Sequence, residues 1–172
     1  ILTVDLYGQL CDYENINETA KKNNLVVIED AAQAINAEYK ERKAGSFGDL
    51  AAFSFYATKN ITCGEGGMIT TDNKTYADNA KLFRQHGRSN MSSYEYSNLG
   101  YNYRMTDINA AILLEQLKKA GIITKKRIEN AQYLSKGLAD IKGIKVPTVK
   151  KDHKHVFHQY TIKVCQDFKM DR

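Results

Sequence analysis

One stretch of the sequence, residues 51–68, limits the fold more than any other. Its first residues, Ala51 to Tyr56, are small or aromatic except for one serine, a composition typical of a strand covered on both faces. Lys59 then stands at the end of the expected strand, and the glycine turn Gly64–Gly67 lets the backbone approach another group closely. The pattern predicts a buried strand, a lysine at its end, a glycine turn and a returning strand.

Two interpretations of Lys59 are open from these residues alone. Most lysines are exposed to solvent, so the simpler interpretation is a surface lysine at a strand end. The alternative is an amine that is partly desolvated and therefore nucleophilic, able to form a Schiff base with a carbonyl group. The choice depends on the groups that the fold brings to this side chain.

The N-terminal part alternates between strand-like and helix-like segments. Residues 1–6 are predicted to form a strand, residues 14–23 a short helix, and residues 25–28 a second strand that stops just before Asp30. This rhythm predicts an α/β fold, in which ligands bind beyond the carboxyl ends of parallel strands. Asp30 is therefore a candidate binding residue, although a structural ion pair or a helix cap on residues 31–34 explains the same position.

Helices and one further strand are expected in the rest of the chain. The spacing of apolar residues predicts helices at residues 76–86, at residues 107–119 with Gly121 as the stop, and at residues 124–139. Residues 155–164 alternate weakly and predict a strand.

Composition excludes several classes of protein. The 172 residues are 42% hydrophobic and 26% charged, which is ordinary for a globular chain, and no apolar run is long enough to span a membrane. The net charge of +5 argues only weakly for anionic ligands, because no nucleic-acid motif appears and solvated helix faces and a loop account for the C-terminal lysines. Three widely spaced cysteines without a CxxC pattern favour reduced thiols in a cytosolic protein.

Two further features bear on what the chain is. It begins without an initiator methionine or a signal-peptide pattern, so we expect a piece of a longer protein. The histidines His153, His155 and His158 resemble a metal cluster, but in a strand only the first two share a face, and no cysteine or carboxylate completes the set. No metal site is therefore expected.

Three blocks of sequence, in order, are similar to one known family. They are VIEDAAQA at residues 27–34, GSFGDLAAFSFYATKNITCGEGGM at residues 45–68 and LGYNYRMTDINAA at residues 99–111. They resemble the DegT/DnrJ/EryC1/StrS aminotransferases, which are pyridoxal-phosphate enzymes of fold type I. The resemblance implies an α/β fold with a mixed, mostly parallel sheet: residues 1–120 as the second half of the cofactor-binding large domain, and residues 121–172 as an inter-domain helix and the start of a small α+β domain.

The resemblance also implies roles for single residues. Lys59 matches the lysine that forms the internal aldimine with pyridoxal phosphate and then moves protons. Asp30 matches the aspartate paired with the pyridine nitrogen, Gln33 the glutamine beside the phenolic oxygen, and Ser54 the serine that binds the phosphate. Asn102 matches the asparagine that reaches the cofactor phosphate of the neighbouring subunit, which implies a homodimer with shared active sites. Three more side chains are either substrate or dimer contacts or solvated helix-end and loop residues: His86, Arg88 and Arg104.

The function implied is transfer of an amino group from an amino acid, glutamate by analogy, to a nucleotide-linked keto sugar in the cytoplasm. A dehydratase branch of the family carries histidine at the position of Lys59, so lysine favours transamination. Two alternatives stay open. One is a non-catalytic remnant that binds partner chains through an exposed sheet edge. The other is a family member that aminates a cyclic ketone without a nucleotide.

Overall fold

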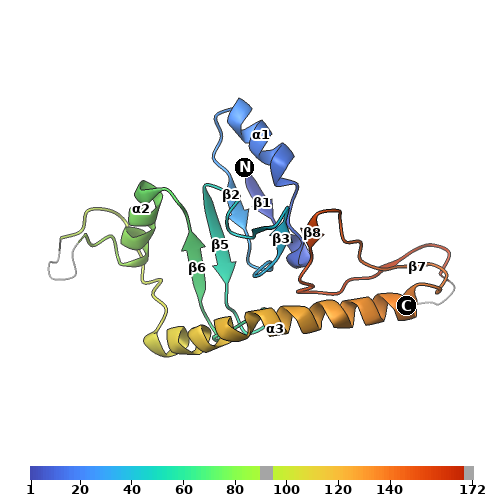
Figure 1. The fold of residues 1–172 in the computed structure, drawn as a ribbon. Coiled ribbons are helices and arrows are strands. Elements are labelled where there is room, and N and C mark those ends of the chain that lie inside the picture. The colour runs from blue at the N-terminus through green and yellow to red at the C-terminus, as the bar shows by residue number, and fades with distance from the viewer. Residues whose placement is uncertain (90–94, 169–172) are drawn as a thin grey trace.

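The computed structural model describes residues 1–89 and 95–168. Its centre is a four-stranded sheet in the order β1-β2-β5-β6 (Figure 1). The strands are β1 (Leu2–Val4), β2 (Ile28–Asp30), β5 (Leu50–Ser54) and β6 (Gly67–Thr70). The first three are parallel and β6 runs antiparallel to β5. This mixed, mostly parallel α/β sheet confirms the predicted fold class.

The connection from β1 to β2 contains the 3-10 turn η1 (Leu6–Gly8) and the helix α1 (Tyr13–Lys22). The helix begins where the Asp12 carboxylate accepts a hydrogen bond from the Asn15 backbone N–H, as an N-cap residue does. Its buried Tyr13 ring stacks on Phe47 at a centroid distance of 4.6 Å. This helix therefore covers one end of the main core, which also contains Val27 and Val156.

A small second sheet ties the C-terminal part of the chain to the N-terminal part. It contains β3 (Glu38–Tyr39), β4 (Arg42–Lys43) and β8 (His153–Lys154), with β8 antiparallel to β3 (Figure 1). A separate pair joins β7 (Ile144–Lys145) to β9 (Lys163–Val164). The strand predicted for residues 155–164 is wrong for most of its length, because residues 155–162 are irregular and only its last two residues pair.

The helices differ from the prediction in one respect. Helix α2 (Lys74–Arg84) begins at an Asn73 cap, close to the expected start. Helix α3 (Asp107–Leu138) is a single helix of 32 residues, about 48 Å long, beneath both sheets (Figure 1). The predicted stop at Gly121 is wrong. A helical glycine costs only about 1 kcal/mol relative to alanine, which the buried Ala120 and Thr124 on either side outweigh.

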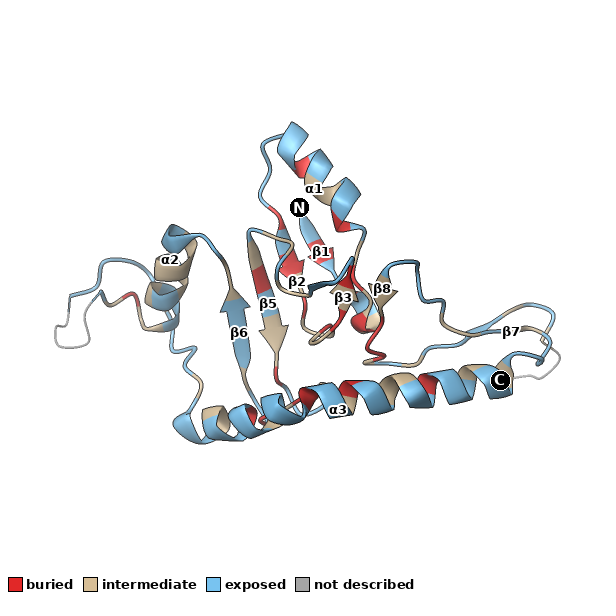
Figure 2. Cartoon of the chain, viewed as in Figure 1, coloured by how far each residue is buried: buried red, intermediate tan, exposed pale blue. Residues whose placement is uncertain are grey.

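The two faces of the central sheet differ in burial (Figure 2). One face is covered and carries Thr3, Glu29 and Ala51. The other face carries exposed apolar side chains, with Leu2 69% and Ile69 54% exposed. The prediction that β5 is covered on both faces is therefore wrong, since Ala52 lies on this open face and no element among residues 1–89 and 95–168 buries it.

The covered face holds two fully buried carboxyl groups, Asp5 and Glu29, both 0% exposed. Asp5 Oδ1 accepts hydrogen bonds from the Cys11 backbone N–H and the Tyr13 hydroxyl, each at 3.0 Å. Backbone N–H groups of residues 45, 47 and 48 donate to the Glu29 carboxylate. Burial, and then the charge of Glu29, raise the pKa of Asp5 to about 7.

Candidate functional site

Asp30 is the last residue of β2, as expected, and lies between Val4 and Ala52 on the open face of the sheet. Its Oδ1 accepts a hydrogen bond from the Ala32 backbone N–H at 3.0 Å. The segment after it forms two turns in place of a helix, so the helix-cap interpretation is wrong and the aspartate closes an Asx turn. No ion pair joins Asp30 to Lys59 in the described chain.

Lys59 lies in the lysine loop, which we define as residues 55–63 between β5 and the glycine turn. It is not at the strand end, because β5 stops at Ser54. The loop is anchored by the buried Phe55 and Ile61, which pack with α3 through Leu113. Lys59 itself is half-buried, and its backbone N–H donates to the Tyr56 carbonyl at 2.9 Å. A half-buried lysine on a rigid loop favours the nucleophile over the ordinary surface residue.

Gln33 and Ser54 are each tied to the backbone through one polar atom. Gln33 Oε1 accepts a hydrogen bond from the Tyr7 backbone N–H at 2.7 Å, so the amide NH2 is the group that points away from Tyr7. Ser54 Oγ accepts from the Tyr56 backbone N–H at 3.3 Å, which leaves its O–H as a donor.

The chemistry of this donor set fits pyridoxal phosphate. A lysine amine suits the cofactor aldehyde, and the Asp30 carboxylate suits a protonated pyridine nitrogen. The Gln33 NH2 group and the Ser54 hydroxyl are donors, as the phenolic oxygen and the phosphate require. Asp30 and Ser54 come from neighbouring strands at the carboxyl edge of the sheet, where α/β folds bind ligands.

The other predicted residues gather elsewhere, at the C-terminal end of α2. The His86 backbone N–H donates to the Tyr101 carbonyl at 2.9 Å. Asn102 forms an isolated β-bridge with Gln85, and Arg88 forms another with Tyr96. The exposed Arg104 donates from Nη1 to Gln85 Oε1 at 3.2 Å. In the described part of the chain, no hydrogen bond joins this group to Asp30, Gln33, Ser54 or Lys59.

The three histidines of the C-terminal segment do not converge. His153 lies against the Tyr39 ring at a centroid distance of 4.5 Å, and His155 stacks on Phe157 at 4.1 Å. His158 instead meets the lysine loop, with Nδ1 3.2 Å from Asn60 Oδ1. Sequence reasoning missed Asn60 and His158 as site residues, because their contact spans 98 positions and no local pattern announces it.

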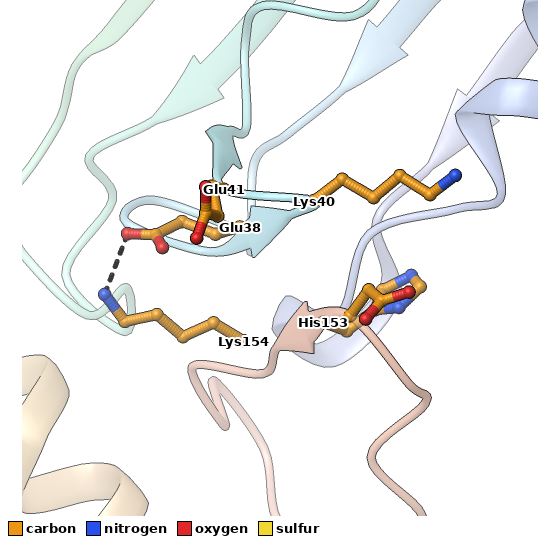
Figure 3. A pocket seen from close by; sticks show the side chains of 6 residues that line it. Glu38, Lys40, Glu41, His153 and Lys154 are labelled. Carbon is orange, nitrogen blue, oxygen red and sulfur yellow. Dashed lines mark hydrogen bonds and ion pairs between the residues drawn. The ribbon is translucent and has the colours of Figure 1, made fainter.

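Two concavities lie outside this edge. A cavity of about 490 Å³ lies between the β3–β4 turn and β8, and charged side chains line it (Figure 3). Within it the Glu38 carboxylate forms an ion pair with the Lys154 amine at 2.9 Å. A larger apolar groove of about 1080 Å³ runs between β5, β6 and α2. None of the predicted site residues lines either one.

Comparison with known proteins decides the family. The model of the DegT/DnrJ/EryC1/StrS aminotransferase family matches residues 1–172. The chain belongs to this family. A GDP-perosamine synthase of Caulobacter vibrioides is 41% identical over 100% of the chain and 47% of that protein, and the spore coat polysaccharide biosynthesis protein SpsC of Bacillus subtilis is 39% identical over 95% and 45%. The chain thus spans less than half the length of these relatives.

Solved structures of family members have the same fold. Helicobacter pylori PseC, an aminotransferase of pseudoaminic acid biosynthesis, superposes with a TM-score of 0.91 at 33% identity, over 98% of this chain and 46% of its own. DesV of S. venezuelae, solved with a ketimine intermediate, gives 0.90 at 34% identity, over 95% and 44%. A GDP-4-keto-6-deoxymannose-3-dehydratase, ColD, also gives 0.90 at 25% identity, over 100% and 48%. No helix among the described residues is both long and apolar enough to cross a membrane.

Proposed function

We propose that this chain is the Schiff-base lysine portion of a pyridoxal-phosphate sugar aminotransferase. The whole enzyme transfers an amino group from an amino acid, glutamate by analogy, to a nucleotide-linked keto sugar. The observation that carries the proposal is the set of Asp30, Gln33 and Ser54, whose side chains accept backbone hydrogen bonds, together with Lys59, whose backbone N–H bonds to Tyr56. Relatives named as GDP-perosamine synthases and as a UDP-linked amino sugar transaminase support the substrate class.

The residues divide the work as follows. Lys59 would hold pyridoxal phosphate through its amine, and as a free amine it would take the proton from Cα of the amino donor and return it. Asp30 would hold the pyridine end of the cofactor and keep it protonated, and the Gln33 amide and the Ser54 hydroxyl would donate hydrogen bonds to its oxygens. Bound pyridoxal phosphate supplies the electron sink for this chemistry.

The assembly is part of the proposal. Residues 1–120 belong to the large domain, and residues 121–172 to the inter-domain helix and the start of the small domain. The exposed Asn102 reaches the cofactor phosphate of the second subunit of a homodimer, and His86, Arg88 and Arg104 contact substrate or that subunit. The free cysteines Cys11, Cys63 and Cys165 support a cytoplasmic protein.

Three other functions are distinguished by the tests described next. The similarity to ColD suggests dehydration as an alternative activity, but a lysine at position 59 favours transamination. A non-catalytic remnant binds no cofactor, and a cyclic-ketone aminotransferase binds the cofactor but not the nucleotide sugar.

The test is a visible-absorbance titration of the chain with pyridoxal phosphate, followed by borohydride reduction and peptide mapping. We expect saturable binding and labelling of Lys59, lost in Lys59→Ala and kept in Lys21→Ala, a matched change of an exposed lysine on α1. Scattered labelling, equal in both variants, would refute the site. In the full-length protein, release of 2-oxoglutarate from glutamate with a GDP- or UDP-linked keto sugar tests the reaction.

A further inference from the structure

A network of hydrogen bonds joins the lysine loop to the C-terminal segment 155–158, which we call the histidine segment. Asn60, only 7% exposed, donates from Nδ2 to the Val156 carbonyl at 3.3 Å. Its Oδ1 lies 3.2 Å from His158 Nδ1. Both ends of the Asn60 carboxamide, next to Lys59, are therefore bound by a segment almost a hundred residues later in the chain.

The network determines the proton position on the His158 ring. A backbone carbonyl only accepts, so the Asn60 end that faces Val156 is its NH2 group. The other end is then the amide oxygen, which also only accepts, so His158 Nδ1 carries a hydrogen and donates it. A neutral ring held in this way has its lone pair on Nε2.

The surroundings keep this ring neutral. Burial, and then the positive charges of Lys59 and Arg127, hold the pKa of His158 below its usual 6.5. The Arg127 guanidinium is fixed close by, because Nη1 donates to the Phe157 carbonyl at 3.1 Å and to that of His158 at 3.4 Å. The neighbours described around the ring are therefore cationic, and an imidazolium there would repel the Lys59 ammonium.

The same segment also fixes Gln33. The His158 backbone N–H donates to the Tyr7 carbonyl at 2.8 Å, and the Tyr7 backbone N–H donates to Gln33 Oε1 at 2.7 Å. Val156 donates from its backbone to Gly8 at 2.9 Å, where the backbone has φ of +95°. Two of the proposed cofactor-binding residues, Gln33 and Lys59, are thus connected to His158, through Tyr7 and through Asn60.

We propose that Asn60 and His158 are positioning residues: His158, with a hydrogen on Nδ1, holds the Asn60 carboxamide and thereby the lysine loop at Lys59. The inference rests on the proposed function of Lys59 and extends it, since it assigns a role in the large-domain site to a residue of the expected small-domain part. Neither residue touches the reacting atoms; both act through the lysine loop and through Tyr7.

The first test reads the ring directly and needs no cofactor. Long-range ¹H–¹⁵N NMR of the four histidines, with His158 assigned from His158→Gln, reports tautomer and pKa. We expect the Nδ1–H tautomer at neutral pH, and its loss in Asn60→Ala. We also expect the pKa of His158 to rise in Lys59→Met but not in Lys154→Met, whose amine pairs with Glu38. An Nε2–H tautomer, or a pKa that Lys59→Met leaves unchanged, would overturn the inference.

The second test measures positioning through borohydride trapping of pyridoxal phosphate on Lys59. His158→Ala is expected to lower the trapping rate about tenfold, the usual effect of losing one buried hydrogen bond. His158→Gln, whose side-chain amide can still donate to Asn60, restores most of it, and His153→Ala, beside Tyr39, leaves it unchanged. Equal trapping in wild type and His158→Ala would refute the role. A wild-type chain that is not labelled on Lys59 would overturn the proposed function instead. The NMR result then tests the hydrogen bond between Asn60 and His158 by itself.

Discussion

Asp5→Asn is expected to make the chain more stable at pH 8, and the difference in stability between the variant and wild type is expected to grow between pH 4 and 7. The folded chain raises the pKa of Asp5 from 3.8 to about 7, because the group is buried and faces the charge of Glu29. A raised carboxyl pKa means that the folded state binds the proton more tightly. Its contribution to the free energy of unfolding is therefore complete below pH 3.8 and is lost as pH rises to about 7.

The size of the effect follows from the shift. A difference of about three pKa units corresponds to on the order of 4 kcal/mol between the two limits, a large part of the stability of a small domain. Asparagine keeps the oxygen that accepts from Cys11 and Tyr13. It also places an NH2 donor where Oδ2 is buried without a hydrogen-bond partner among the described residues, and it carries no charge to be repelled by Glu29.

Urea unfolding followed by far-UV circular dichroism, repeated from pH 4 to 8, measures this. The free energy of unfolding of Asp5→Asn minus that of wild type should rise from pH 4 to 7 and level off by pH 8. The lowered pKa values of His155, about 4, and of His158 add the same opposite slope to both proteins and cancel in this difference. Asp140→Asn, an exposed change beyond the end of α3, is the matched control and should follow wild type. A slope that persists unchanged in Asp5→Asn would show that another group titrates and would refute the reasoning.

Three further substitutions test the fold. Gly121→Ala should stabilise α3 by up to about 1 kcal/mol in thermal unfolding, because nothing lies within 4 Å of the added Cβ; destabilisation would mean that the helix bends there. Gly8→Ala should destabilise by about 1–3 kcal/mol, since φ is +95° and the added Cβ would lie 2.6 Å from Val156 Cγ2; a neutral result would show that the histidine segment does not pack there. Asp12→Ala should lower the urea midpoint through the loss of the α1 cap, and an unchanged midpoint would contradict that cap.

Local signals explain most of what could be predicted. The apolar run before Asp30 marked the end of β2, and Thr106 marked the start of α3 through its side-chain cap. The same reasoning failed at Gly121, where burial of neighbouring residues outweighed a weak local preference. It also placed Lys59 too close to the strand, because the lysine loop is held by contacts with α3 that have no sequence period.

The candidate site was predictable only as far as the family resemblance reached. Asp30, Gln33, Ser54 and Lys59 stand in two matched blocks, and hydrogen bonds to the backbone orient the side chains of the first three. The link to His158 was not predictable, since a histidine contact across 98 positions depends on the whole topology. As a candidate metal ligand, His158 was compared only with the histidines next to it in sequence, so a partner from a distant part of the chain was not considered.

The long separation between Asn60 and His158 has a consequence for biosynthesis. After Asn60 is added, the ribosome must add 98 further residues before His158 exists. At about 5–20 residues per second this takes on the order of 5–20 s, during which the carboxamide beside Lys59 lacks its native partners. Contacts between residues so far apart in the sequence also form late in folding. The lysine loop is therefore completed only after the histidine segment has been made, so capture of pyridoxal phosphate should follow folding of the histidine segment and not precede it.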